Sequence, residues 1–244
     1  MIVLNIKKVA CVIVDRNAPD SLFKYLEEQK IEYIKSTYIK NIIDAVSTHP
    51  DMQICYIGNN KYVCEPSVFD YYSEKLDRYN INLIKGEKYI LSTYPDDISY
   101  NVVVTDSIAF HNLKYTDAFL RKEIENTDIS IYNVKQGYTK CATCVVGDKA
   151  FVTSDVGIYN MCVENDVDCL LIEKGSIKLD NDVNGFIGGC SGMISDDTLL
   201  FCGDLSMHPS YNDIIEFAFK HGINIVSSSR DVLTDVGSII PVIQ

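Results

Sequence analysis

The hydrophobic positions of the chain fall into short runs that recur in a fixed order. Between residues 140 and 172, two apolar runs precede a helical pattern and a third apolar run follows it. The runs have the length of short strands and end at turn signals such as Gly147-Asp148. The same order restarts after Gly188-Gly189 and continues to Val226. The pattern therefore predicts a strand–strand–helix–strand unit that repeats along the chain.

The unit can be traced back to the beginning of the chain. The expected strands cover residues 9–14, 31–34, 52–57, 62–64, 81–84, 101–104, 108–110, 129–132, 150–153, 169–172, 199–202, 223–226 and 238–243, with two more that end at Gly147 and Ile194. The expected helices cover residues 20–29, 68–79, 117–124, 158–165 and 212–220. Gly58-Asn59-Asn60 is a hairpin signal between two of the strands.

The first unit has one expected strand before its helix instead of two, and the chain ends with a spare strand, Ser238–Ile243. We expect the spare strand to complete the sheet of the first unit and to close the units into a ring, which leaves no sheet edge exposed. A doubly wound parallel sheet competes, because strands alternate with helices, but it explains the paired strands less well. The sequence predicts an α/β propeller of five pseudo-repeats, as one domain over residues 1–244.

Composition narrows the functional classes. The net charge of −12 disfavours binding to a nucleic-acid backbone, which needs clustered Lys and Arg. No apolar run is long enough to span a membrane. The segment MIVLNIKKVACVIVD carries two lysines and no cleavage site, so we interpret it as a strand and not as a signal peptide, and we expect a cytoplasmic protein. Disulfides are then not expected among the nine cysteines.

Two kinds of site lack a motif in this sequence. No glycine-rich phosphate loop is present, which argues against nucleotide binding. The spacing Cys141-x-x-Cys144 has no second pair to complete a zinc site. We therefore expect neither a metal nor another cofactor.

A closed ring of five such units resembles the pentein fold of guanidino-group-modifying enzymes. That superfamily includes arginine deiminases, dimethylarginine hydrolases, amidinotransferases and a non-enzymatic ribosome anti-association factor. Short segments are also similar to an uncharacterised bacterial family that we place as a branch of this superfamily. They are Gly137–Cys141, Thr153–Asp155, Gly185–Gly189, Gly203–Leu205 and Asp235–Ser238.

The resemblance to the enzymes is incomplete at the motifs. Those enzymes use a cysteine nucleophile near the C-terminus after a glycine-rich turn, a histidine acid/base and carboxylates that hold the guanidinium. The matching segment here is 235–241, and no cysteine follows Cys202. Their Thr-Arg-Asp motif has a partial match in Thr153-Ser154-Asp155, and only Gly188-Gly189 remains of Glu-Gly-Gly-Asp.

In a ring of repeats, the junctions before the first strands face one mouth, so their polar residues are the candidates for a ligand pocket. The candidate nucleophiles are Cys141, next to the cation of Lys140, and Cys190. His49 is the candidate base. The candidate ligand-binding residues are Asp51, Asn101, Lys140, Asp155, Asp204, His208 and Asp235. Each of these residues has an alternative interpretation as a turn, capping or buried strand residue. The other two histidines, His111 and His221, are expected at the surface.

Two functions follow from these residues. The first is binding or modification of a small cationic guanidino- or amino-acid-like ligand in the axial pocket. Any enzyme of this kind would be a Cys-dependent hydrolase or transferase acting on guanidino or amide-like C–N bonds. The alternative is a non-catalytic factor that docks a protein partner on the rigid propeller. That function predicts a filled axis and an exposed apolar patch.

Overall fold

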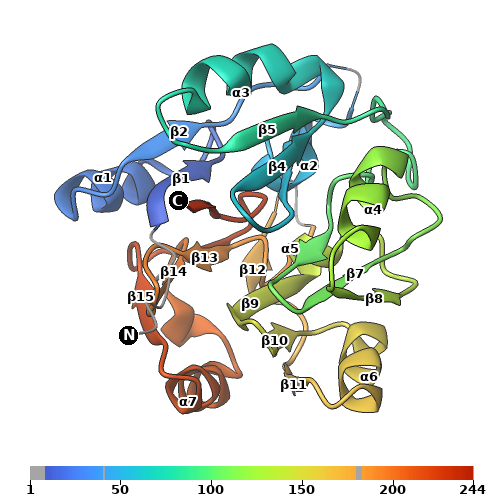
Figure 1. Ribbon diagram of the computed structural model, residues 1–244. Coiled ribbons are helices and arrows are strands. Elements are labelled where there is room, and N and C mark those ends of the chain that lie inside the picture. Colours follow the sequence, from blue (N-terminus) through green and yellow to red (C-terminus); the bar gives the residue numbers. More distant parts are fainter. Residues whose placement is uncertain (1–8, 41, 180–182, 244) are drawn as a thin grey trace, which may run out of the picture.

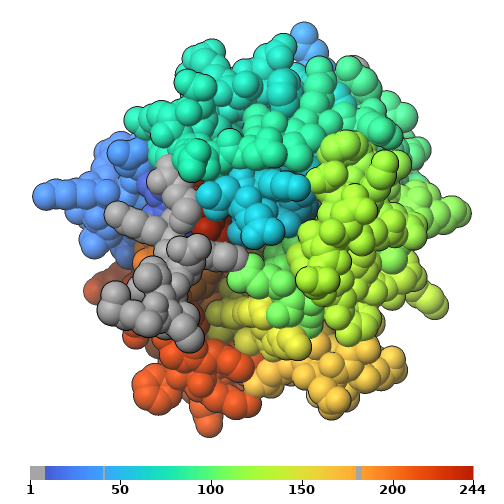
Figure 2. All heavy atoms as spheres, in the orientation of Figure 1, coloured from blue at the N-terminus to red at the C-terminus, as the bar shows by residue number. Residues whose placement is uncertain are grey.

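The chain forms a ring of small sheets with helices around the outside (Figure 1). The computed structural model describes residues 9–40, 42–179 and 183–243. In the space-filling view, the units follow one another around the ring in sequence order (Figure 2). The described residues form five three-stranded sheets in the ring, with strand orders β17-β1-β2, β3-β4-β5, β6-β7-β8, β9-β10-β11 and β13-β14-β15. This is the α/β propeller of five units that the hydrophobic pattern predicts.

The bounds of the elements follow the predicted runs closely. The strands of the five sheets are β1 (Val9–Val14), β2 (Tyr33–Lys35), β3 (Ile54–Tyr56), β4 (Lys61–Cys64), β5 (Asn82–Lys85), β6 (Val103–Val104), β7 (Ile108–His111), β8 (Ser130–Asn133), β9 (Thr143–Gly147), β10 (Ala150–Thr153), β11 (Asp168–Leu171), β13 (Ser191–Met193), β14 (Thr198–Phe201), β15 (Asn224–Ser227) and β17 (Ile240–Ile243). The outer helices are α1 (Asp20–Glu28), α3 (Phe69–Leu76), α4 (Ala118–Glu125), α6 (Val156–Glu164) and α7 (Tyr211–Lys220). Single-turn 3-10 helices cover Asp44–Val46, Pro66–Val68 and Leu205–Met207.

The middle strand of each sheet is antiparallel to the first strand and parallel to the third. A parallel pair needs a crossover connection, and the outer helix of each unit provides it. Middle strands such as β7 and β10 are buried along their whole length, whereas third strands such as β5 and β8 have exposed ends. A strand that is buried on both faces is a continuous apolar run in the sequence. This burial explains why the middle strands are easily recognised in the sequence.

The two ends of the chain close the ring. Strand β17 pairs antiparallel with β1, with Cys11 opposite Val242 and Ile13 opposite Ile240. The hydroxyl of Tyr62 on β4 donates to the carbonyl of Pro241 at 3.0 Å and accepts from the amide of Ile243 at 2.9 Å. The terminal strand is therefore held by the first unit and by the second. The predicted closure is confirmed.

Some junctions are helical where the sequence predicts strand. Short helices α2 (Pro50–Gln53) and α5 (Thr139–Ala142) come directly before β3 and β9. The expected strand 52–57 therefore begins two residues late, and Cys141 lies in a helical turn and not at the start of a strand. An apolar run of this length fits either structure, so periodicity does not separate them.

A small sheet between the fourth and fifth units was not predicted. Strand β12 (Ile177–Lys178) pairs in parallel with β16 (Leu233–Thr234). Strands of two residues have no measurable alternation, so the sequence pattern carries no signal for them. The N-terminal part of the expected strand, residues 1–8, lies outside the described residues. None of the described helices has the length and apolar character needed to cross a membrane.

The expectation that His111 lies at the surface is wrong. The residue ends β7 and is fully buried. Its Nε2 lies 2.7 Å from the carbonyl oxygen of Gly137, and its Nδ1 lies 2.7 Å from the hydroxyl of Thr116. Because a carbonyl only accepts, Nε2 is the protonated nitrogen. Burial lowers the pKa of His111 to about 4, although the bond to Gly137 acts in the opposite direction.

We expect His111 to make the protein less stable in mild acid. Below its ordinary pKa of 6.5 the unfolded chain takes up a proton that the folded chain does not bind until about pH 4. The unfolded state is therefore favoured by about 1.4 kcal/mol per pH unit through that interval, or roughly 2 kcal/mol at pH 5.

Urea denaturation at pH 7 and pH 5 measures this effect. The His111→Gln variant is the control, because it removes the titrating group while other acid-sensitive groups stay in place. The loss of stability between the two pH values is expected to be smaller in the variant by roughly 2 kcal/mol. Equal losses in the two proteins would contradict the assignment of this pH dependence to His111.

Candidate functional site

Polar side chains from several junctions meet on the axis of the ring. Each precedes the first strand of a sheet, and none is more than 5% exposed. We call this group the axial cluster; it consists of His49, Asp51, Asn101, Cys141, Asp235 and Ser238. The structure thus brings together five of the residues that the sequence singles out as site candidates, and it adds Ser238.

Hydrogen bonds connect the cluster around Asp51. The thiol of Cys141 donates to Asp51 Oδ2 at 2.9 Å, and the hydroxyl of Ser238 donates to the same oxygen at 2.7 Å. The amide nitrogen of Asn101 donates to Cys141 Sγ at 3.2 Å. Its amide oxygen accepts from the backbone N–H groups of Lys140 and Cys141. Asn101 thereby positions the helical turn that carries Cys141.

His49 lies between two further carboxylates. Its Nε2 is 3.7 Å from Asp15 Oδ2, and its Nδ1 is 4.0 Å from Asp235 Oδ1. Asp235 is itself held by the backbone N–H groups of Phe186, at 2.8 Å, and Gly237, at 3.0 Å. The hydrogen-bond acceptor of the Cys141 thiol is therefore Asp51 and not His49, which the sequence suggests as its base.

Burial and the carboxylates decide the state of the Cys141 thiol. Desolvation raises its pKa well above the ordinary value, and the nearby charges of Asp51 and Asp235 raise it further. Burial likewise raises the pKa of Asp235, against the opposing effect of His49. The neighbouring Lys140 does not lower the Cys141 pKa, because desolvation is the largest effect and the anionic neighbours act in the same direction. The thiol is protonated at neutral pH and is not an activated nucleophile.

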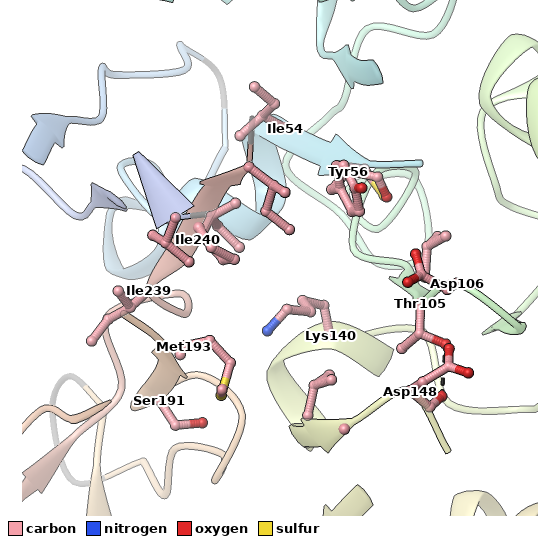
Figure 3. Close-up of a pocket in the computed structure, with 18 of the residues that line it drawn as sticks. Ile54, Tyr56, Thr105, Asp106, Lys140, Asp148, Ser191, Met193, Ile239 and Ile240 are labelled. Atoms are coloured by element: carbon pink, nitrogen blue, oxygen red, sulfur yellow. Dashed lines mark hydrogen bonds between the residues drawn. The ribbon is translucent and has the colours of Figure 1, made fainter. Parts of the chain in front are cut away.

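A pocket of about 530 Å³ lies on the same axis, beside the cluster (Figure 3). All five sheets contribute to its wall through their first strands β3, β6, β9, β13 and β17. Aliphatic side chains form a large part of the wall, and Ile54, Met193, Ile239 and Ile240 are among its residues. None of the six residues of the axial cluster is a lining residue. The axis therefore holds two separate environments, a closed polar cluster and an apolar pocket.

Lys140 belongs to the pocket, although Cys141 next to it belongs to the cluster. The Lys140 side chain extends into the pocket toward Ile240 (Figure 3). Thr105, Asp106 and Asp148 lie together on another side of the pocket. None of the ion pairs among the described residues involves Lys140. Its amine is thus a positive charge in a wall that also carries the carboxylates of Asp106, Asp148 and Asp196.

Four candidates from the sequence lie outside both environments. Cys190 is fully buried and donates to the carbonyl of Ile187 at 3.2 Å, and desolvation raises its pKa well above the ordinary value. Asp155 caps α6 by accepting from the amide of Ile158 at 2.9 Å.

The other two candidates also serve local structure. Asp204 caps a 3-10 turn by accepting from the amide of Ser206 at 2.9 Å. His208 is buried, and its Nδ1 accepts from the amide of Ser210 at 3.1 Å. The structure therefore gives Asp155, Asp204 and His208 the turn and capping contacts that are the alternative interpretation of these residues.

The sequence pattern does not single out Asp15, Ser238 or the lining residue Cys55 as site residues. Asp15 follows β1, the middle strand of the first unit, just as Asp155 follows β10. An aspartate that follows the middle strand of a unit is a candidate site residue, and this criterion also selects Asp15 in the first unit. Ser238 and Cys55 carry no comparable signal, because a serine after a turn and a cysteine in an apolar run are both common in buried structure.

Solved structures with the same architecture are guanidino-group-modifying enzymes. SxtG, an amidinotransferase of the saxitoxin biosynthetic pathway from Microseira wollei, superposes with a TM-score of 0.57 at 10% identity, over 95% of each chain. A dimethylarginine dimethylaminohydrolase from Pseudomonas aeruginosa, with citrulline bound, gives a TM-score of 0.56 at 8% identity, over 91% of this chain and 92% of the other. Inosamine-phosphate amidinotransferase from Streptomyces griseus gives 0.53 at 10% identity, over 87% and 74%.

These likenesses identify the fold: the chain is a pentein-type α/β propeller. At the sequence level, residues 13–240 match the model of a family of unknown function, DUF6873, and the chain belongs to that family. No curated protein matches the sequence. The comparisons thus define the architecture and the family, whereas the chemistry of the site rests on this chain's own residues.

The backbone at Gly237 forms part of the wall behind His49. Gly237 has φ +64°, and a Cβ there would lie 2.2 Å from His49 Cβ and 2.6 Å from its Cα. Gly222 has a similar φ of +74°, but a Cβ there would have no neighbour within 4 Å. The two glycines share a backbone conformation and differ in the space around them.

We predict that Gly237→Ala destabilises the protein more than Gly222→Ala. An alanine in the left-handed conformation costs about 1–2 kcal/mol of stability relative to glycine, and this cost is common to both variants. The contact with His49 adds about 1–3 kcal/mol to the loss in Gly237→Ala. Chemical denaturation measures both free energies of unfolding. Equal losses would contradict the close packing of residue 237 against the axial cluster.

Proposed function

We propose that the protein binds a small amino-acid-like ligand in the axial pocket, with the carboxylate of the ligand on Lys140. The observation that carries the proposal is the Lys140 amine, which extends into an apolar pocket and forms no ion pair with a described residue. A charge in apolar surroundings needs a partner of opposite sign. A ligand carboxylate supplies that partner through a charge-assisted hydrogen bond.

The wall of the pocket fits the aliphatic part of such a ligand. A volume of about 530 Å³ is in the usual range for small-molecule sites, which are mostly apolar with a few convergent polar groups. Ile54, Met193 and Ile240 line the same pocket as Lys140 and provide contacts for a hydrocarbon chain. Shape and hydrophobicity therefore favour a small organic molecule over an inorganic anion.

The acidic residues of the pocket would pair with a positively charged group of the ligand. Asp148 and Asp196 are both lining residues. Burial acts to raise the pKa of Asp148, but hydrogen bonds from Ser107 and Thr105 hold it below the ordinary value, so the group is charged at neutral pH. An amino or guanidino group would be favoured near these carboxylates. This arrangement supports the cationic ligand that the sequence predicts and adds a carboxylate at its other end.

Several features support binding without the covalent chemistry of the fold's enzymes. The segment where the resemblance implies a cysteine nucleophile contributes Ile239, Ile240 and Pro241 to the wall of the pocket. Cys141 does not line the pocket. Cys55 lines it, but burial raises the pKa of its thiol to about 12, although Lys140 acts to lower it. A thiol with that pKa is almost entirely protonated at neutral pH.

Docking of a protein partner is the second candidate function. Tyr89, Leu91 and Tyr94 are each at least 50% exposed in the connection between β5 and β6. Exposed apolar residues that are close together are a feature of interaction surfaces. A propeller that binds a protein partner on its surface does not need a pocket on its axis. The axial pocket therefore favours the small-molecule proposal.

Matched pairs of compounds test the proposed ligand class. Arginine and ornithine carry a carboxylate, whereas their decarboxylated counterparts agmatine and putrescine do not. We expect the acids to bind at least about tenfold more tightly in isothermal titration calorimetry, since a hydrogen bond between charged groups contributes about 1.5–3 kcal/mol. Equal or tighter binding of the amines, or no binding of any of the four, would contradict the proposal.

A lysine variant tests the role of the amine itself. Lys140→Met keeps the length of the side chain and removes its charge, and we expect it to weaken binding of the acids at least tenfold without weakening binding of the amines. Lys149→Met is the matched control, because Lys149 is exposed next to Asp148 and does not line the axial pocket. The control variant should bind all four compounds like the original protein.

A further inference from the structure

Three side chains of the axial cluster have the chemistry and spacing of metal ligands. His49, Asp51 and Cys141 each offer one ligand atom, and these atoms all lie within 4.8 Å of one another. All three residues are buried, with exposed fractions of 3%, 1% and 4%. Two of them come from the junction before β3 and the third from the junction before β9, which lie far apart in the sequence.

Two polar atoms of this group have no hydrogen-bond partner among the described residues. They are Nδ1 of His49 and Oδ1 of Asp51, and both are shielded from solvent. Buried polar atoms in native proteins are nearly always paired, so each unpaired atom requires an explanation. Here the two atoms belong to neighbouring ligand-type side chains, and both have lone pairs that a metal ion would accept.

The charges around the cluster also favour a cation. Asp15, Asp51 and Asp235 are buried carboxylates that surround a single imidazole. Among the ion pairs of the described residues, His49 is the only basic partner of Asp15 and Asp235, and Asp51 has none. Buried charges are normally paired or coordinate a metal. A cation is therefore favoured where these carboxylates converge around one imidazole.

We propose that His49, Asp51 and Cys141 form a binding site for a divalent zinc-type ion. An imidazole nitrogen, a thiolate and a carboxylate are the usual ligands of zinc, whereas magnesium and calcium prefer oxygen ligands alone. Bonds of about 2.0–2.3 Å in a tetrahedron place ligand atoms roughly 3.3–3.8 Å apart. Side-chain rotations that move the ligand atoms by about an ångström bring the three atoms to these separations.

The contacts around the three ligands fit this role. With Nδ1 of His49 on the metal, its Nε2 faces Asp15 at 3.7 Å, and metal-binding histidines typically direct the second nitrogen to a carboxylate. Ser238 donates to Asp51, and Asn101 donates to Cys141. Cys141 would release its thiol proton to solvent on binding and form the sulfur–metal bond as a thiolate.

The proposed site is structural and lies apart from the ligand pocket. None of its three residues lines the pocket, and each is at most 4% exposed, so we assign the ion a structural role. The ion would join the second unit to the fourth across the axis. Cys144 does not belong to this site, because it packs in a separate hydrophobic cluster with Val146 and Val152. The site is therefore unrelated to the Cys141-x-x-Cys144 spacing.

The metal content of the full-length protein is the first test. Because the site is closed to solvent, we expect the ion to be incorporated during folding, and the protein should be purified from cells grown with added zinc. Mass spectrometry of the elements is expected to find about one zinc per chain. The chain is then unfolded with a chelator and refolded with cobalt, which is expected to give the near-ultraviolet charge-transfer band of a thiolate bound to cobalt.

Variants assign the ligands. Cys141→Ser and Asp51→Asn are close in size to the original residues, and we expect each to lower metal affinity at least tenfold, with the thiolate–cobalt band absent in Cys141→Ser. Cys144→Ser is the control, because it removes a neighbouring buried thiol and should keep both the zinc and the band. Zinc content and the cobalt band do not depend on ligand binding in the axial pocket. A failure of the metal proposal would therefore leave the amino-acid titrations unaffected.

Two results would overturn the proposal. The first is an original protein that contains no zinc as purified and gives no thiolate–cobalt band after refolding. This result does not depend on whether any variant folds. The second is a band that persists in Cys141→Ser and disappears in Cys144→Ser, which would place the ion at a different thiol.

Discussion

The pairing of β17 with β1 is the contact on which the rest of the structure depends. It closes the ring, and it also brings residues 235–238 next to residues 49–51. The backbone amide of Asp51 then donates to the carbonyl of Gly237 at 3.1 Å, and the hydroxyl of Ser238 donates to the Asp51 carboxylate. Without this closure, Asp51 and His49 would lose their contacts with residues 235–238. The fold and the axial cluster therefore form together.

Burial at the closed axis determines what the same side chains can do. Cys141 near a histidine looks like a nucleophile with its base, but in a dry and anionic setting the neutral thiol is favoured. The features that make it a poor nucleophile, a carboxylate in contact and no access to solvent, make it a good metal ligand once a cation is present. The neighbouring groups, more than the identity of the residue, decide between these two kinds of chemistry.

Two consecutive residues on the axis face two different environments. Lys140 and Cys141 are consecutive in the turn of α5, and helical side chains at adjacent positions point in different directions. One side chain therefore reaches the apolar pocket and the other enters the closed cluster. The chain shares the architecture of guanidino-group-modifying enzymes, but aliphatic residues occupy the part of the pocket wall where their nucleophile is expected. The architecture thus carries a different set of side chains, as is common for widely used folds.

The order of the elements, the repeat and the closure can all be predicted from the sequence. These features depend on the burial of whole strands and on the count of strands in each unit, and both are visible as runs of apolar residues. The sequence also placed His49, Asp51, Asn101, Cys141 and Asp235 at equivalent junctions. The three-dimensional arrangement was needed to show that Asp155, Asp204 and His208 make local contacts, and that Lys140 and Cys141 face different environments. Such distinctions depend on side-chain direction and on distances between residues far apart in the chain, and a one-dimensional pattern contains neither.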